Sequence, residues 1–287
     1  MTDRGNALKR YEGGNPYGKL FIYYFKGAAG NPGIPEGAFI GNWEEDGFSF
    51  LFFSRPWDAG ISDLLRRIPH LELLDRYEMT YEEWLGEKLV PCRIGRFFIS
   101  APWERLQFKV APEREEFPIA LDPGVVFGTG THPTTRECLE FMERAFGESR
   151  VESVLDLGTG TGLLAVAAAK LGARTTLAVD FNYLAARTAG NNIVLNDVAD
   201  KVLALQGRAE DFMDTGADLL IANIHYDVMK DLIRSAGFPR KNRFILSGLL
   251  ESQASAVEET LSHLPVRILE KRTVGAWTTY YGKGRVS

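Results

Sequence analysis

The feature that most constrains the fold is an alternation of apolar strand-like runs and helical segments, which begins at Ile119 and continues almost to the end of the chain. Alternating strands and helices predict a parallel sheet with helices on both faces, and strands that are apolar throughout are expected when both faces are buried. The segment 266–285 differs, because two strand-like runs meet near Gly275 and predict a closing hairpin. We therefore expect an α/β fold with a seven-stranded, Rossmann-like sheet and a C-terminal antiparallel hairpin. The five strands before the hairpin are SVLDL, TTLAVD, KVLALQG, ADLLIAN and RFILSGL.

The first eighty residues follow another pattern. Short aromatic-rich runs are separated by Gly, Pro and Asn turn signals, and a helix at 61–68 precedes a possible fourth strand at 71–79. This pattern predicts a small α+β domain at residues 1–80. Residues 81–118 are expected to link it to the large domain at 119–287. Two domains agree with a length of 287 residues, because a domain averages roughly 150.

Composition limits the partners and the compartment. Two cysteines, Cys92 and Cys138, are too few for a disulfide framework and are typical of a reducing compartment. The start of the chain is polar, and no apolar run approaches the roughly 20 residues of a membrane span, so we expect a cytoplasmic protein without a membrane partner. A net charge of -5 argues against broad nucleic-acid binding through phosphates and favours a basic partner.

A glycine-rich turn follows the first strand of the large domain. Asp156 lies in that strand, and Gly158 and Gly160 begin a turn into a helix, where free N–H groups favour a carboxylate or phosphate. Asp180 ends the next strand, twenty-two positions after Gly158, where a carboxylate can accept both hydroxyls of a ribose. The spacing is G-x-G-x-G rather than G-x-G-x-x-G, which favours S-adenosylmethionine over a nicotinamide cofactor. A tight structural turn is the alternative interpretation.

A second Gly-Thr loop, LDPGVVFGTGTHPTT, precedes the turn by about twenty residues. Its hydroxyls, at Thr131 and Thr135 among others, stand at the start of a helix, where one can reach a carboxylate and another can cap the helix. Phe127 lies between glycines, where it could close over a bound sulfonium or bury itself. His132 precedes a proline, and we expect it to hold backbone geometry rather than to move protons.

The large domain resembles the ribosomal protein L11 methyltransferase family. The match is carried by LDPGVVFGTGTHPTT, VLDLGTGTGLLAVAAAKLGA, AVD, ADLLIANI and LSGLLESQA, between Leu121 and Ala254. The resemblance implies a class I methyltransferase sheet that binds S-adenosylmethionine, preceded by a smaller substrate-recognition domain. By position, Thr135, Gly158, Asp180 and Asn223 correspond to cofactor-binding residues of the family. One Gly-Thr loop would then lie under the cofactor and the other would cover it.

Asn223 ends the fourth strand, next to the transferred methyl in this fold, and its carbonyl could orient an attacking amine. His225 and Tyr226 follow where family members usually carry smaller, apolar residues. The run from Asn223 to Tyr226 also resembles the Asn-x-x-Tyr pattern of methyltransferases that act on adenine amino groups, where the aromatic ring stacks on a flipped base. Tyr226 could equally line a channel for a lysine stem or belong to the core, and His225 is a candidate base alongside water.

A second departure lies in the small domain, where a Gly/Pro-rich segment, AAGNPGIPEG, replaces the family's first helix. We expect a protein N-methyltransferase that acts on lysine or α-amino nitrogen, of ribosomal protein L11 or a related protein, and we assign no metal site. The alternatives are an RNA or DNA amino-methyltransferase and a cofactor-binding protein without turnover. The sequence does not indicate an oligomeric state.

Overall fold

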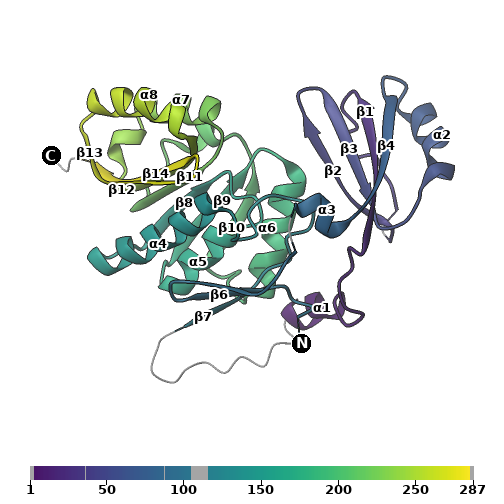
Figure 1. The fold of residues 1–287 in the computed structure, drawn as a ribbon, viewed down its shortest axis with the longest axis horizontal. Helices are drawn as coiled ribbons and strands as arrows, with labels where there is room; N and C mark the ends of the chain where they lie inside the picture. The colour runs from purple at the N-terminus through teal and green to yellow at the C-terminus, as the bar shows by residue number, and fades with distance from the viewer. Residues whose placement is uncertain (1–2, 36, 87, 105–115, 285–287) are drawn as a thin grey trace.

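The computed structural model describes residues 3–35, 37–86, 88–104 and 116–284, and its fold is drawn in Figure 1. A small four-stranded sheet lies to one side of a larger seven-stranded sheet, and a third, three-stranded sheet packs against helices of the large domain. Residues 1–2, 36, 87, 105–115 and 285–287 of the expected domains lie outside the described residues. The elements are α1 (Asp3–Lys9), β1 (Lys19–Lys26), β2 (Phe39–Glu45), β3 (Phe48–Phe53), α2 (Asp58–Arg67), β4 (Glu72–Thr80), α3 (Tyr81–Leu85), β5 (Cys92–Ile94), β6 (Phe97–Ser100), β7 (Phe117–Ala120), α4 (Pro133–Glu148), β8 (Ser153–Leu157), α5 (Leu163–Leu171), β9 (Thr175–Asp180), α6 (Tyr183–Leu195), β10 (Val202–Gln206), β11 (Leu219–Asn223), α7 (Tyr226–Arg234), β12 (Arg243–Leu250), α8 (Glu251–Ser262), β13 (Val266–Val274) and β14 (Trp277–Gly284), with short 3-10 turns at Ala209–Phe212 and Phe238–Arg240.

The large sheet has the strand order β10-β9-β8-β11-β12-β14-β13. Strands β8 to β12 pair in parallel, whereas β14 pairs antiparallel with both β12 and β13. The predicted seven-stranded sheet with a closing hairpin is therefore confirmed. The order reverses between β8 and β11, and the carboxyl ends of strands at such a switch point are where open α/β sheets bind ligands.

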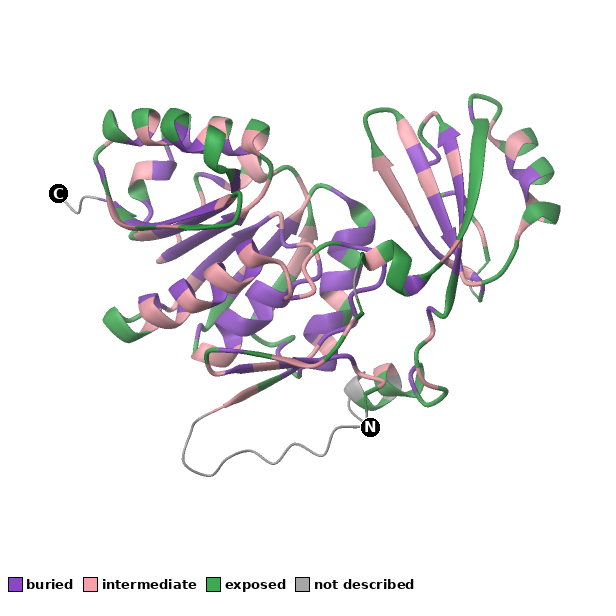
Figure 2. Ribbon diagram, viewed as in Figure 1, coloured by how far each residue is buried: buried purple, intermediate pink, exposed green. Residues whose placement is uncertain are grey.

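Helices cover both faces of this sheet, as the continuous apolar strands predict (Figure 1). Along β11, Leu219 and Ile221 belong to the core cluster formed with α4, α5 and α6. Leu220 and Ala222 belong to the opposite cluster, formed with α7 and α8. Figure 2 shows the central strands as buried along their length. Burial of both faces fixes the register, because a shift of one residue would exchange the two sets of side chains.

Two helices of the large domain differ from the sequence expectation. The expected order contains no helix between Asn223 and Arg243, yet α7 occupies part of this interval and buries Met229, Leu232 and Ile233. The run SQASAVEETLSHL predicts a helix capped by Ser252, but α8 begins at Glu251 with Leu250 as its N-cap, and the Gln253 side chain accepts a hydrogen bond from the Leu250 N–H. No helix of the described residues is long and apolar enough to cross a membrane.

The small domain is an antiparallel sheet of order β2-β3-β1-β4 with α2 on its outer side (Figure 1). The expected fourth strand is present as β4. Between β1 and β2 the chain runs through residues 27–38, and none of the described residues there is helical. The described residues of this segment thus form the predicted Gly/Pro-rich loop, and the loss of a family helix here stays an interpretation.

The stretch expected as a linker contains ordered structure. It includes α3, β5 and β6, and β6 pairs in parallel with β7 to form the three-stranded sheet. Ile94, Phe97 and Ile99 of this sheet are buried in the same cluster as α4 and α5. This part of the chain packs on the large domain, so where the domain boundary lies stays a proposal.

The small domain rests on the loop that carries the second Gly-Thr motif. Tyr17 and Tyr81 stack with ring centroids 4.9 Å apart, in one core cluster with Val125 and Val126 of the loop. The Tyr17 hydroxyl donates to an Asp122 carboxylate oxygen at 2.9 Å, and the Tyr81 hydroxyl donates to the Gly124 carbonyl at 2.6 Å. The position of the loop therefore depends on both domains.

Candidate functional site

The glycine-rich turn after β8 has a left-handed backbone. Gly158, Gly160 and Gly162 have φ angles of +70°, +56° and +80°, a region that other residues enter only at a cost. A Cβ atom on Gly160 would lie 2.5 Å from the Phe127 carbonyl oxygen, and one on Gly158 would lie 2.1 Å from the Ile224 side chain. These glycines are therefore required by the chain's own packing, whatever binds above them.

The two Gly-Thr loops are bonded directly to each other. The Thr161 N–H donates to the Phe127 carbonyl at 3.1 Å, and the Thr161 hydroxyl donates to the Gly128 carbonyl at 2.7 Å. The buried Asn192 amide donates to the carbonyls of Asp122 and Thr161, both at 2.8 Å, and so ties the start of one loop to the other. This contact explains why two such loops occur so close together in the sequence.

Two carboxylates lie beside the turn. Asp156 is fully buried, and its Oδ2 accepts from the Thr159 hydroxyl at 2.5 Å, whereas its Oδ1 has no hydrogen-bond partner among the described residues. Burial, reinforced by the nearby Asp180 charge, raises the pKa of the Asp156 carboxyl to about 7. Burial also raises the pKa of the Asp180 carboxyl, although the N–H groups of Gly160 and Asn182 oppose this shift. Raised carboxyl pKa values beside a strand-end turn are typical of functional sites.

Asp180 keeps free capacity to accept hydrogen bonds. Its Oδ2 accepts from the Gly160 N–H at 2.9 Å, and its Oδ1 accepts from the Asn182 N–H at 2.9 Å. A carboxylate offers about four lone pairs, so each oxygen retains one for a ligand hydroxyl. The carboxylate therefore fits the predicted role on a ribose while it also holds the turn.

The start of α4 is capped by a histidine. His132 occupies the N-cap position, and its Nδ1 accepts from the Thr134 N–H at 3.3 Å. The expectation that one of the loop threonines caps this helix is wrong, and His132 has the geometric role expected for it. Thr131 pairs with the Thr129 hydroxyl at 2.6 Å, within the loop. Thr135, in the first turn of the helix, is buried.

Thr135 and Asn223 come together from distant parts of the sequence. The Asn223 amide lies 3.5 Å from the Thr135 hydroxyl, at the carboxyl end of β11. The parallel register places Asn223 beside Ser247 of β12, while β8 lies on its other side. The structure thus brings Thr135, Asn223 and the glycine turn to one edge of the sheet, as predicted.

Aromatic side chains lie around this edge. Phe127 is 54% exposed, and its ring meets His132 edge-on at 5.2 Å, while His132 meets Trp277 at 4.9 Å on its other side. Phe181, directly after Asp180, is 67% exposed. Phe181 and Trp277 are not among the residues that the sequence motifs single out. A large aromatic residue next to a strand-end carboxylate was the available sequence signal for Phe181. Trp277 had no such local signal, because only the fold of the hairpin brings it against His132.

His225 and Tyr226 stand at the start of α7. His225 is exposed and occupies the N-cap position without a capping hydrogen bond from its side chain. Tyr226 is half-buried and packs against the core cluster between the sheet and α7, with the Lys230 ammonium 6.0 Å from its ring. Part of the ring therefore has a core role, and a contribution to the acceptor pocket stays a prediction.

Comparison with known proteins decides the family. The family model described as "Ribosomal protein L11 methyltransferase" matches residues 65–285. The chain belongs to this family. Ribosomal protein L11 methyltransferases of Desulfitobacterium hafniense and Desulforamulus reducens are 38% and 34% identical to it, over 78% and 72% of this chain and 72% and 67% of theirs.

A solved structure supports the same assignment. The ribosomal protein L11 methylase of Lactobacillus delbrueckii subsp. bulgaricus superposes with a TM-score of 0.58 at 30% identity, over 67% of this chain and 96% of that one. As a member of the L11 methyltransferase family, the chain is a class I methyltransferase, and the family's methyl donor is S-adenosylmethionine. The family model begins at residue 65, so β1, β2 and β3 lie outside it.

Proposed function

We propose that this L11 methyltransferase family member binds S-adenosylmethionine at the carboxyl ends of β8, β9 and β11 and methylates a lysine or α-amino nitrogen of ribosomal protein L11 or a related protein in the cytoplasm. The observation that carries the proposal is the convergence of the glycine turn, the Asp180 carboxylate and the Thr135–Asn223 pair at one edge of the sheet. These groups come from four separate elements, and the family's chemistry needs a site of this kind.

Each of these groups fits one part of the cofactor. The spare lone pairs of Asp180 suit two ribose hydroxyls, and the exposed Phe181 ring beside it offers a flat apolar surface for the base. The N-terminus of α4, with the Thr135 hydroxyl, favours a carboxylate, as do the N–H groups at Gly158 and Gly160. Asp156, which the sequence also predicts for the cofactor site, is fully buried and would support the turn from beneath through its hydrogen bond from the Thr159 hydroxyl.

The cofactor supplies a methyl group made electrophilic by its bond to a positively charged sulfur. The protein must hold an uncharged amine in line with that bond, and such positioning supplies several kcal/mol of the barrier. An isolated lysine has a pKa of about 10.4, so the acceptor must lose a proton before attack. Desolvation by Phe127 and Tyr226 would lower that pKa, and His225 or water would take the proton. The Asn223 carbonyl would orient the amine.

The acceptor assignment rests on charge and on the named relatives. The net charge of -5 suits a basic protein better than a nucleic acid. The curated relatives carry the name of a protein methyltransferase, and this favours the protein acceptor over the RNA or DNA alternative. The small domain packs on the loop beside the site, where it could present a protein substrate.

The test is methyl transfer from labelled S-adenosylmethionine to purified ribosomal protein L11, with a whole-cell lysate and a total RNA fraction assayed in parallel. We expect label in L11 at lysine or the α-amino group, located by mass spectrometry, and none in RNA. Label in RNA alone would overturn the acceptor assignment. Binding of S-adenosylhomocysteine without transfer to any fraction would instead identify a cofactor-binding protein without turnover.

A further inference from the structure

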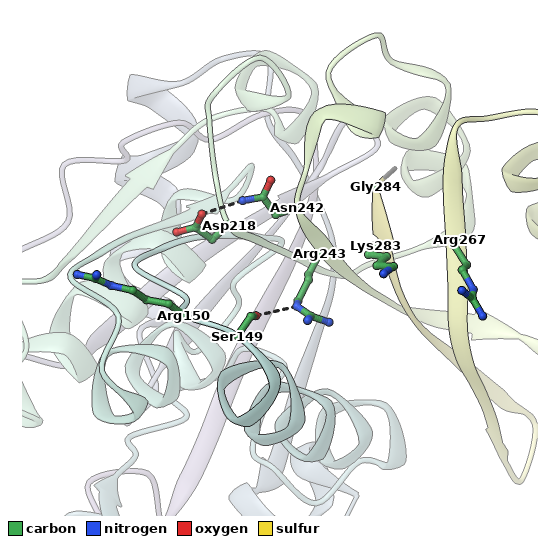
Figure 3. A pocket seen from close by; sticks show the side chains of 8 residues that line it. All are labelled: Ser149, Arg150, Asp218, Asn242, Arg243, Arg267, Lys283 and Gly284. Atoms are coloured by element: carbon green, nitrogen blue, oxygen red, sulfur yellow. Dashed lines mark hydrogen bonds between the residues drawn. The ribbon is translucent and has the colours of Figure 1, made fainter. Parts of the chain in front are cut away.

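A cavity of about 880 Å³ lies at the edge of the large sheet opposite the glycine turn (Figure 3). Asp218, which directly precedes β11, and Arg243, the first residue of β12, line it. The glycine turn instead follows the carboxyl end of β8, and a five-residue strand separates the two edges by roughly 15 Å. The cavity is therefore separate from the proposed methyl-transfer site.

Three cations form a row across neighbouring strands beside this cavity. Lys283 of β14 is the direct partner of Arg243 on β12 and of Arg267 on β13. Directly opposed residues in an antiparallel pair point to the same face with Cβ atoms about 5 Å apart, so the row spans about 10 Å. Arg150, just after α4, adds a fourth cation, and Figure 3 shows cationic side chains on both sides of the cavity.

Only part of this positive charge is neutralised by the protein. Arg243 pairs with Glu148 at 2.8 Å, and Arg150 pairs with Glu152 at 2.5 Å. Within the described ranges, neither Lys283 nor Arg267 forms an ion pair, and both are exposed.

The carboxylate in the cavity serves another purpose. Asp218 accepts hydrogen bonds from the N–H groups of Glu152 and Ser153, from the Ser153 hydroxyl and from the Asn242 amide, at 2.9 to 3.0 Å. Its oxygens thus fix the loop before β8, and it does not act as the counter-ion of Lys283 or Arg267.

Like charges directly opposite each other destabilise a sheet, and a bound anion would remove this cost. The described residues that line the cavity are charged, polar or glycine, and none of them has an aromatic or aliphatic side chain that could hold a base or a lipid chain. Such a lining suits an oxyanion with several negative charges, which arginine and lysine bind through charge-assisted hydrogen bonds. We propose that this cavity is a second binding site, specific for phosphate groups, carried by a small phosphorylated molecule or by a nucleic-acid backbone.

The direct test is calorimetric titration of the full chain with inorganic pyrophosphate in the presence of saturating S-adenosylhomocysteine. We expect saturable binding that weakens as salt is added. The double variant Arg267→Gln, Lys283→Gln should bind about tenfold more weakly or worse, because two charged donors are lost. The matched control, Lys26→Gln with Arg55→Gln, removes the same charge from exposed positions of the small domain and should bind like the wild type.

A second titration, with a ten-nucleotide single-stranded RNA, separates the two sources of phosphate. RNA binding that competes with pyrophosphate and is lost in the double variant would identify a nucleic-acid backbone, and binding of pyrophosphate alone would identify a small phosphorylated ligand. A charge-preserving variant, Arg267→Lys with Lys283→Arg, should retain binding and shows that the effect is not one of folding. Absence of saturable pyrophosphate binding, or equal binding by the double variant and the control, would overturn the proposal.

Discussion

Two aspartates at opposite edges of the large sheet have carboxyl pKa values that are shifted in opposite directions. Asp156, near the carboxyl end of β8, is fully buried with one oxygen unpartnered, and its pKa is raised to about 7. Asp218, at the amino end of β11, is also partly buried, but four donors outweigh the effect of burial and lower its pKa. At this edge the protein's own donors satisfy the Asp218 carboxylate, whereas Lys283 and Arg267 of the cationic row have no ion-pair partner among the described residues. At the Asp156 edge the Asp180 carboxylate retains lone pairs for a ligand, and raised carboxyl pKa values of this kind cluster at functional sites.

The pH dependence of the free energy of unfolding is the first test of this difference between the two aspartates. The folded state holds the Asp156 proton up to about pH 7, whereas the unfolded state releases it near pH 4, so between these values folding binds protons and the free energy of unfolding falls as pH rises. At about 1.4 kcal/mol per pKa unit the total is on the order of 4 kcal/mol. Asp156→Asn should remove the Asp156 part of this dependence, as measured by urea unfolding from pH 4 to pH 8, while the contribution of Asp180, whose pKa is also raised, remains. An unchanged slope would show that Asp156 ionises normally.

Asp218→Asn should change the pH dependence of stability in the direction opposite to Asp156→Asn. A lowered pKa stabilises the folded state above the unfolded-state value near pH 4, and this contribution disappears as the pH falls through the folded value. The variant should therefore be less stable than the wild type at pH 7 and approach it in acid. If both aspartate variants responded alike, the contrast between the two edges would be lost.

Substitution of the glycine turn should have the next largest effect. Gly160→Ala adds a Cβ atom 2.5 Å from the Phe127 carbonyl at a φ of +56°, which should cost roughly 2–5 kcal/mol from backbone strain and overpacking. Binding of S-adenosylhomocysteine should weaken as the two loops separate. Gly172→Ala is the matched control, because its φ is +114° and nothing lies within 4 Å of the added atom. Its thermal unfolding temperature should fall because of backbone strain alone, and its affinity for S-adenosylhomocysteine should be unchanged.

A smaller effect is expected from Asp180→Ala. Loss of charged hydrogen bonds should weaken S-adenosylhomocysteine binding by about 1–3 kcal/mol in calorimetry. Asp200→Ala, an exposed position, should leave the affinity unchanged. Equal affinity of Asp180→Ala and the wild type would remove the ribose assignment.

The smallest effect concerns the acceptor pocket. Tyr226→Ala should reduce methyl transfer by about tenfold, equivalent to 1.4 kcal/mol, while cofactor affinity stays nearly intact. Tyr226→Phe retains the ring and should retain most of the rate. Parallel losses of stability and of cofactor binding in Tyr226→Ala would assign the ring to the core alone.

The sequence predicts the large sheet well because its strands are continuous apolar runs, and strand ends place Asp180 and Asn223 at one edge by topology alone. Local patterns are weaker elsewhere. Helix α7 begins within the run from Asn223 to Tyr226, which is interpreted from the sequence as part of the acceptor site. No helix is predicted there, although Met229 and Ile233 have helical spacing. The parallel pairing of β6 with β7 joins two short strands that are not contiguous in the sequence, and no local pattern specifies such a pair. Likewise, cap preferences favour threonine over His132, and the loop geometry decides otherwise.

The place where the cofactor binds is tested most directly by a crystal structure of the full chain grown with S-adenosylhomocysteine. We expect the ligand at the carboxyl ends of β8, β9 and β11, with its ribose hydroxyls on the Asp180 carboxylate and its amino-acid part against Gly158 and the start of α4. Ligand density at any other place, with this edge empty, would contradict the account.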